Sequence, residues 1–357
     1  MRDVLKSLSI KHFRNITSAS LQLSPGVNIF CGDNAAGKTS VLEAVYLLSH
    51  GRSFRTTDKN NLINRDADHL FLDASLRGYS EIETKVRVLK KTNEPIKVSL
   101  NDNKSESLSS IIRYLPAIFM GTDFHRSLID SPAYRRRLIN WALFHVEHSF
   151  HGLWMNYQKS VRQRNALLKR RDSGRELHFW EEQICSLSSR IFPMLDKMVQ
   201  MIDDCIATEY QNHQGLTPSL TLNPGWDMQE KLSVQLKASR ITDMRANKTS
   251  IGCHRFDIDI MTPKGRAKYF CSEGEMKHLA YLIIMAVAST VEKQSHKRPI
   301  FLLDDWASEL DNTHGELIAD CLLQKKNQIL LTSIRSKHWT DRVGTMFHVK
   351  HGEIIMH

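Results

Sequence analysis

Short apolar segments separated by turn-forming residues fill the first third of the chain. Their apolar positions run together or alternate with polar ones, and Ser, Pro and Gly bound them, which predicts β-strands. A segment with helical spacing at residues 39–49 divides these strands into two groups. The predicted strands lie at 5–10, 18–23, 27–32, 69–78, 81–91 and 96–104. The last three alternate regularly and predict an antiparallel meander.

The pattern changes at Ser131 and changes back after Pro224. Residues 131–212 are rich in Leu, Met, Arg and Gln at helical spacing, so we expect a separate helical arm there. From residue 272 onward a helix, an apolar strand at 300–305, a second helix and an apolar strand at 327–333 follow in order. Helices that alternate with buried strands predict a parallel sheet covered by helices.

Together these patterns predict an α/β fold in which two distant segments build one domain. Residues 1–130 and 251–357 are expected to form its two halves, with a mixed sheet and an antiparallel β-subdomain. Residues 131–250 are expected to form an inserted, mainly helical arm domain.

The composition is that of an ordinary globular protein. The chain has 357 residues, of which 41% are hydrophobic and 25% are charged, and its formal net charge is +10. Its six cysteines form no CxxC pair, so we expect free thiols rather than a zinc site or disulfides. The longest apolar run, Leu279–Ala288, is about half of the ~20 residues that a membrane span needs, and the N-terminus lacks the apolar stretch of a signal peptide. We therefore expect a cytoplasmic protein without membrane contact.

The segment 32–39, GDNAAGKT, fits the phosphate-binding pattern GxxxxGK[ST] in full. An apolar strand precedes it and a helix follows, as a P-loop requires. Glycines let backbone N–H groups surround phosphate oxygens, Lys38 is expected to bridge the β- and γ-phosphates, and the Thr39 hydroxyl to bind Mg²⁺. The residues expected to bind ATP here are Gly32, Asp33, Asn34, Ala35, Ala36, Gly37, Lys38, Thr39 and Ser40.

A pair of carboxylates ends the apolar strand at 300–305. Asp304 is expected to hold Mg²⁺, and Asp305 to orient or deprotonate the attacking water, so that Asp305 and Lys38 are the candidate catalytic residues. An acidic pair that caps the next helix is the simpler alternative.

Ser272, Gly274 and Glu275 precede a strongly apolar helix and resemble the signature motif of ABC-type ATPases. In that class the motif binds the γ-phosphate held by a second subunit. Taken alone, this string is more often only a helix N-cap. The segment WASELD, with Ser308 and Asp311, resembles the D-loop that follows the carboxylates in the same class. The resemblance implies an ABC/SMC-type ATPase head that closes as a homodimer around ATP.

Four segments resemble the RecF family of recombination mediators from end to end of the chain. They are IKHFRN at 10–15, the stretch 114–144, GCHRFDIDI at 252–260 and MFHVKHGEI at 346–354. The resemblance implies a DNA-binding ATPase that dimerises with ATP and helps RecO and RecR load the RecA recombinase at single-strand gaps. It further implies that Arg14 reaches or senses the nucleotide.

The sequence departs from the pattern of the family and its relatives at four places. Glu275 stands where glutamine is common, and Thr122-Asp123 occupy the region of the Q-loop glutamine. Cys253 replaces a typical proline, and Thr332-Ser333 stand where transporter ATPases place a switch histidine.

Basic residues are concentrated in the predicted arm. Residues 131–175 contain ten Lys or Arg and two acids, which accounts for most of the net charge and is typical of contact with a phosphate backbone. A solvated helical face is the alternative. The candidate DNA-binding residues are Arg135, Arg136, Arg137, Arg162, Arg164, Lys169, Arg170 and Arg171.

Two other classes of protein share parts of these motifs. An ABC transporter subunit or another SMC-like ATPase would share Lys38, Asp304 and the signature string, although a transporter would need the glutamine and histidine that are missing here. An ATPase-coupled nuclease of the overcoming-lysogenization-defect kind would add a metal-binding domain, for which we expect no room after the last predicted strand.

Overall fold

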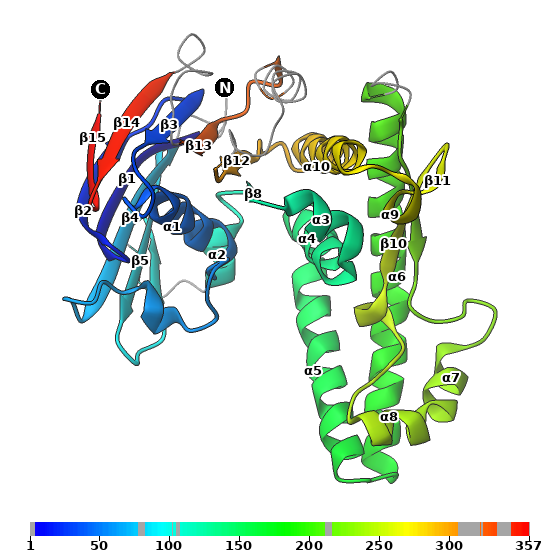
Figure 1. Ribbon diagram of the computed structural model, residues 1–357. Coiled ribbons are helices and arrows are strands. Elements are labelled where there is room, and N and C mark those ends of the chain that lie inside the picture. Colours follow the sequence, from blue (N-terminus) through cyan, green and yellow to red (C-terminus); the bar gives the residue numbers. More distant parts are fainter. Residues whose placement is uncertain are drawn as a thin grey trace. The chain divides into compact units, whose positions relative to one another are not determined.

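The computed structural model describes residues 4–77, 83–101, 103–104, 108–210, 216–305, 322, 324–333 and 344–356. The chain forms two compact units (Figure 1). The first, which we call the head unit, comprises Met1–Phe124 and His296–His357. The second, the arm unit, comprises His125–Ser295.

The arm unit is longer than the arm that the sequence predicted. Its predicted start at residue 131 differs by a few residues, but its predicted end at residue 250 falls well inside the unit. Strand β10 (Asp257–Thr262) pairs with β9 (Ser219–Asn223), and helix α10 (Glu273–Ser295) packs on α4 and α6 of the same unit. Residues 251–295 therefore belong with the arm, because their hydrogen bonds and apolar contacts are made there.

One sheet of the head unit contains five parallel strands among the described residues. Its order is β15-β14-β3-β13-β12-β8, with β15 as the single antiparallel strand. Every residue of β3, β12 and β13 is buried, as expected for strands covered on both faces. The strands are β3 (Val27–Cys31), β8 (Ala117–Met120), β12 (Ile300–Leu303), β13 (Ile329–Ser333), β14 (Thr345–Lys350) and β15 (Glu353–Met356).

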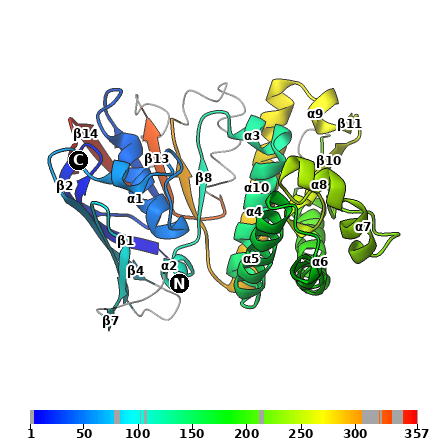
Figure 2. The same cartoon turned by 90° about the horizontal axis from the view of Figure 1, so that it is seen from below.

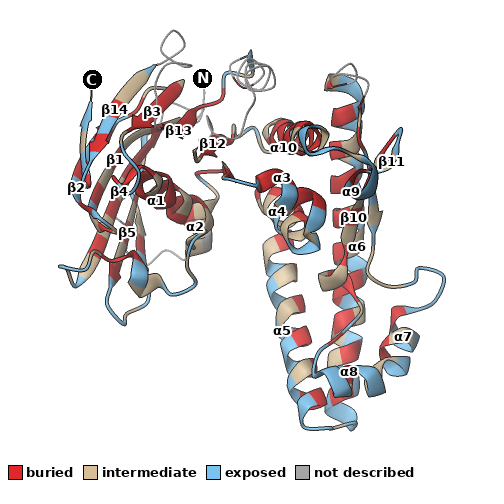
Figure 3. Cartoon of the chain, in the orientation of Figure 1, coloured by how far each residue is buried: buried red, intermediate tan, exposed pale blue. Residues whose placement is uncertain are grey.

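The second sheet of the head unit is the predicted antiparallel one, in the order β2-β1-β4-β5-β6-β7. Its apolar side chains share one core with those of the parallel sheet and of helix α1 (Lys38–His50), which Figure 3 shows buried along most of its length. The strands are β1 (Val4–Phe13), β2 (Ile16–Gln22), β4 (His69–Arg77), β5 (Glu83–Lys91), β6 (Lys97–Leu100) and β7 (Asn103–Lys104). Two short helices complete the described part of this unit, η1 (Lys59–Leu62) and α2 (Leu108–Ile112).

The arm unit is built on the long helices α5 (Phe150–Lys169) and α6 (Arg175–Glu209), which pack side by side in Figures 1 and 2. Both have a buried apolar stripe and an exposed polar face. The other helices are α3 (Phe124–Asp130), α4 (Pro132–Val146), α7 (Leu232–Ala238), α8 (Arg240–Ala246), η2 (Cys253–Arg255) and α9 (Ala267–Phe270), and β11 (Gly265–Arg266) completes the small sheet. Among the described residues, no helix combines the length and apolar character that crossing a bilayer requires.

Candidate nucleotide site

The loop between β3 and α1 has the backbone geometry of a phosphate cradle. Gly32 passes so close to the main chain of β14 that an added Cβ would lie 2.1 Å from the Val349 carbonyl oxygen. Gly37 has a φ of 119°, and its Cβ would lie 2.9 Å from the Asn15 side chain. Both glycines are thus required by this loop, which ends at the N-terminus of α1, where backbone N–H groups attract anions.

Asn15 ties the loop to the turn between β1 and β2. Its Nδ2 donates to the Ala36 carbonyl at 3.1 Å, and its Oδ1 accepts from the Ser40 hydroxyl at 2.9 Å. The amide bridges the end of the loop and the start of the helix. This role of Asn15 was not predicted from the sequence, where the residue stands out only as part of the IKHFRN segment.

Lys38 points back into the loop that precedes it. Its ammonium donates to the carbonyl oxygens of Gly32 at 2.6 Å and Asp33 at 2.9 Å, and the residue is buried. The positive charge therefore lies inside the phosphate cradle, as the motif predicted.

Thr39 and Asp304, the two predicted magnesium ligands, meet at the carboxyl edge of the parallel sheet. The Thr39 hydroxyl donates to Asp304 Oδ1 at 2.9 Å. A hydroxyl and a carboxylate oxygen at one point are the hard oxygen ligands that Mg²⁺ prefers, so the residues present fit this ion.

Thr332, at the end of the adjacent strand β13, holds both aspartates. Its hydroxyl donates to Asp304 Oδ1 at 2.7 Å and accepts from the Asp305 backbone N–H at 2.8 Å. Asp305 adopts a left-handed conformation with a φ of 50°, which is uncommon for a residue other than glycine. Thr332 thus fixes the carboxylate pair from the position where transporter ATPases have histidine.

These residues line one open cavity of about 1310 Å³ in the head unit, which is large enough for a nucleoside triphosphate. Arg55 and Arg65 also line it, although the sequence analysis did not select them. Thr122, from the region that the sequence assigns to the Q-loop, lines it with a hydroxyl-bearing side chain.

Arg14 lines the same cavity, but its guanidinium is held by neighbouring groups. It forms a bidentate ion pair with the buried Glu43 of α1, at 2.9 Å and 2.7 Å, and donates to the Asn61 carbonyl at 2.7 Å. These contacts tie β1, α1 and η1 together. Contact between Arg14 and the nucleotide stays a prediction. The contacts that Arg14 makes within the chain are structural, because they hold neighbouring segments together.

The signature residues Ser272, Gly274 and Glu275 lie at the start of α10 in the arm unit, and the first two are exposed. The Ser272 N–H donates to Glu275 Oε2 at 2.8 Å, and the Glu275 N–H approaches the Ser272 hydroxyl at 3.4 Å. This is a capping box, which begins the helix. Asp311 and Ser308 of the predicted D-loop lie outside the described residues.

Two arginines that the sequence predicted to contact DNA are instead buried in ion pairs, so the prediction is wrong for both. Arg164 has no exposed surface, and its guanidinium binds Asp243 at 2.7 Å and Glu181 at 3.2 Å. Arg135 is buried and forms a bidentate pair with Asp257, with both distances 2.8 Å. Both side chains join separate elements of the arm and are not available to a phosphate backbone.

The remaining candidates differ in exposure. Arg136 is half-buried and donates to the Phe256 carbonyl at 2.9 Å, a contact that favours a structural role. The exposed candidates are Arg137, Arg162, Lys169, Arg170 and Arg171.

Comparison with known proteins identifies the family. The family described as RecF/RecN/SMC N terminal domain matches residues 4–354. The chain is 32% identical to the DNA replication and repair protein RecF of Aliivibrio fischeri strain MJ11, over 98% of this chain and 99% of that protein. The chain belongs to the RecF family. The RecF of Vibrio parahaemolyticus serotype O3:K6 is 30% identical over the same shares of the two proteins.

Solved structures confirm the predicted ABC/SMC-type fold. A structure of the recombination mediator protein RecF-ATP in the RecFOR pathway superimposes with a TM-score of 0.89 at 23% identity, covering 100% of this chain and 98% of that one. The Smc head domain of Pyrococcus furiosus, at 14% identity, gives a TM-score of 0.59 over 99% of this chain and 96% of that one. The chain therefore has the fold of an ABC/SMC-type ATPase head.

Proposed function

We propose that this protein binds ATP and Mg²⁺ in the head-unit cavity, and that ATP joins two copies on DNA near single-strand gaps. The observation that carries the proposal is the convergence of Lys38, Thr39 and Asp304, contributed by segments at opposite ends of the chain, on one cavity. These residues form a P-loop together with the carboxylate that such sites place at the end of a neighbouring strand. The family of this chain is one of ATPases.

In this proposal five residues of the cavity have defined roles. Lys38 binds the β- and γ-phosphates, while Thr39 and Asp304 hold the magnesium ion. When bound, magnesium supplies positive charge that stabilises the negative charge developing on the phosphate oxygens. Asp305 orients the attacking water and accepts its proton. Thr332 keeps the two aspartates in place.

Gly274 supports a role for the signature in contact with a second copy. It is the second residue of α10, and apart from its chain neighbours and the backbone of its own helix, no described atom lies within 4 Å of the position that its Cβ would occupy. Its φ is not among the positive values, so neither packing nor backbone conformation requires glycine there. Glycine costs a helix stability relative to alanine, so its presence favours close approach by something outside this chain. A triphosphate held by the partner copy fits this requirement.

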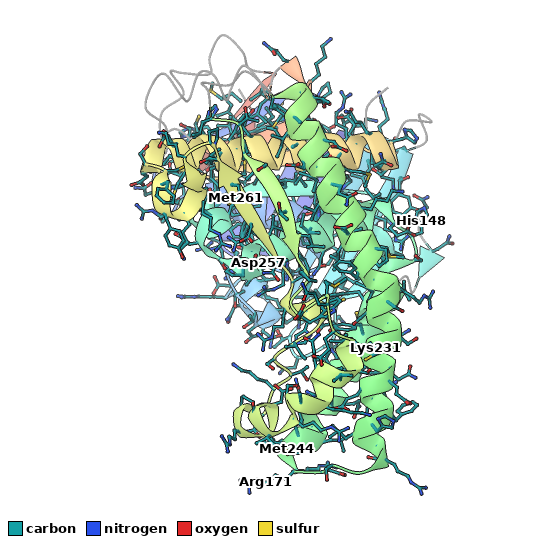
Figure 4. All side chains as sticks on the ribbon, turned by 90° about the vertical axis from the view of Figure 1, so that its right-hand side faces the viewer. His148, Arg171, Lys231, Met244, Asp257 and Met261 are labelled. Atoms are coloured by element: carbon teal, nitrogen blue, oxygen red, sulfur yellow. The ribbon has the colours of Figure 1, made fainter. Side chains whose placement is uncertain are left out.

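We place the DNA contact at the end of the arm where α5 meets α6, which we call the arm tip. Lys169 ends α5, Arg170 and Arg171 follow, and Arg175 begins α6; all four are exposed. Figure 4 shows Arg171 at this end of the arm, close to Met244 of α8. Helix α8 and the turn after it add two exposed cations, Arg245 and Lys248. Such a cluster of exposed cations suits the negative charge of a phosphate backbone.

The biological setting follows from the family. RecF in the structural comparison is named as the recombination mediator of the RecFOR pathway. We propose that this chain likewise acts in the cytoplasm with RecR and RecO, upstream of RecA loading, on single- and double-stranded DNA. Hydrolysis in this proposal is slow and stimulated by DNA, and it serves to release the dimer.

Retention of gapped DNA in ATP and in ADP tests the proposal. We expect ATP to increase retention, the Lys38→Met variant to lose this difference, and the hydrolysis-blocked Asp305→Asn variant to remain on DNA and to elute as a dimer. Equal retention by the unmodified chain in both nucleotides would contradict an ATP-gated function.

A further inference from the structure

The first turn of α10 carries a carboxylate at the signature position where glutamine is common in relatives. Both oxygens of Glu275 are engaged, one by the Ser272 N–H at 2.8 Å and the other by the Lys264 ammonium at 2.5 Å. The Lys264 ammonium and the Ser272 backbone lower the pKa of Glu275 to about 2. Glu275 is therefore ionised at every physiological pH.

An ionised carboxylate at this point conflicts with the proposed role of the helix. The N-terminus of α10 would attract a phosphate through its unpaired N–H groups and its dipole. A carboxylate fixed in the same turn repels that phosphate, and the repulsion grows as an approaching partner excludes water. A signature with Glu275 therefore needs a compensating positive charge nearby.

The β10–β11 hairpin supplies this charge. Lys264 lies in the turn between the two strands, where the Thr262 hydroxyl accepts from its N–H at 3.2 Å. Glu273, the other acid of the first turn of α10, has a cation of its own, because Arg126 of α3 donates to it at 2.9 Å. Each carboxylate in this turn is thus paired with at least one basic side chain from another element of the arm unit.

We propose that Lys264 is a positioning residue of the signature: by neutralising and orienting Glu275, it allows the start of α10 to accept a triphosphate carried by a second copy of this chain. The inference rests on the proposed ATP-held dimer. The pair also fixes the Ser272 backbone through Glu275, so one contact serves both the charge and the geometry of the signature.

If the Lys264–Glu275 pair were an ordinary surface ion pair, its removal would not affect dimerisation. Exposed pairs contribute little to stability, and removing one would leave nucleotide-dependent association unchanged. The hairpin offers a matched control, because Arg266 pairs with Asp259 at 3.1 Å and is as exposed as Lys264, with 55% and 54% of the side chain accessible. The Arg266→Ala variant removes the same charge from the same hairpin without touching Glu275.

The test is a double-mutant cycle on ATP-dependent dimerisation, measured by sedimentation of the full chain with ATP, with ADP and without nucleotide. We expect Lys264→Ala to raise the dimer dissociation constant about tenfold, the size of effect that one unneutralised charge near a phosphate produces. Glu275→Gln should tighten the dimer, and the double variant should return to within about threefold of the unmodified chain. Binding of ATP by single copies, followed with a fluorescent analogue, should be the same in all variants, and Arg266→Ala should dimerise normally.

Each other outcome has a defined meaning. A Lys264→Ala variant that dimerises like the unmodified chain would overturn the inference, and so would a double variant as weak as Lys264→Ala alone. Both results leave the ATP-held dimer of the unmodified chain intact and so leave the proposed function standing. If the unmodified chain itself fails to dimerise in ATP, the proposed function falls and the inference falls with it.

Discussion

Thr39 and Asp304 are separated by most of the chain, yet the Thr39 hydroxyl donates a 2.9 Å hydrogen bond to the Asp304 carboxylate. The contact arises from the parallel sheet. Strand β3 leads into the loop before Thr39, β12 ends just before Asp304, and β13 lies between the two strands. Since the carboxyl ends of parallel strands share one edge, both residues reach one point.

Thr332 should be required for hydrolysis more than for ATP binding. Thr332→Val removes the hydroxyl that donates to Asp304 and accepts from the partly buried Asp305 N–H, at a cost of about 1–3 kcal/mol in unfolding free energy. We expect the hydrolysis rate to fall at least about tenfold and half-saturation to need more Mg²⁺. Thr332→Ser keeps the hydroxyl and should remain close to the unmodified chain. Normal hydrolysis by Thr332→Val would show that the hydroxyl does not position the carboxylates.

Gly274→Ala should stabilise the chain while weakening the dimer. Alanine favours a helix by up to about 1 kcal/mol over glycine, and its methyl group would meet no described atom of this chain. Gly152→Ala is the matched control, since Gly152 lies in the first turn of α5 and has equally open surroundings. Denaturant unfolding should show a similar gain for both variants, whereas only Gly274→Ala should impair association in ATP. Impairment by both, or by neither, would remove the argument for close approach at Gly274.

The basic residues of the arm should separate into two functional groups. Arg164→Met leaves the buried Asp243 carboxylate without its cationic partner and should cost about 3–5 kcal/mol of stability. Arg170→Ala and Arg171→Ala should leave stability unchanged but weaken DNA binding, each reducing the slope of log affinity against log salt by about 0.9. Arg190→Ala serves as a control, because Arg190 is an exposed cation about four turns along α6 from Arg175. An unaltered salt slope in the double arm-tip variant would move the DNA site elsewhere.

His254 should make the arm less stable in acid. Burial lowers the pKa of its ring to about 4, from an ordinary value of about 6.5. The neutral ring accepts from the Tyr157 hydroxyl at 2.9 Å and donates to the Thr249 carbonyl at 3.0 Å. Because the unfolded chain takes up the proton more readily, stability is complete above about pH 6.5 and falls by up to about 3 kcal/mol as the pH approaches 4.

The unfolding free energy at pH 5 and pH 7.5 measures this effect. The difference between the two pH values should be smaller in His254→Gln than in the unmodified chain. Equal pH dependence in both proteins would show that other groups are responsible for the loss in acid.

The nucleotide site was predictable from the sequence because its signals are local. The P-loop needs a strand, eight residues and a helix in succession, and Asp304 and Asp305 end an apolar strand, so both signals can be recognised without knowing the fold. The contact of Thr332 with both aspartates was not predictable in this way. It depends on β13 lying beside β12, and a threonine at the end of a buried strand has no distinctive pattern.

The DNA-contact predictions for Arg135 and Arg164 were wrong for a related reason. Arg164 and Arg170 belong to one basic segment, and charge density alone does not distinguish them. Arg164 is buried because Asp243, contributed by α8, lies opposite it. Similarly, the sequence predicted α10 to belong to the head because an alternation of helix and strand begins there. Its packing partners are α4 and α6 of the arm, which lie far earlier in the chain.

The central claim is that the ATP bound by one copy is completed by the signature of another. Mixing two inactive variants tests it most directly: Lys38→Met, which lacks the phosphate-binding lysine, and Ser272→Arg, which blocks the signature. Each alone should hydrolyse almost no ATP. A mixed dimer contains one intact composite site, so equal mixing should restore roughly a quarter of normal hydrolysis if copies associate at random. A mixture no more active than its two separate components would contradict the claim.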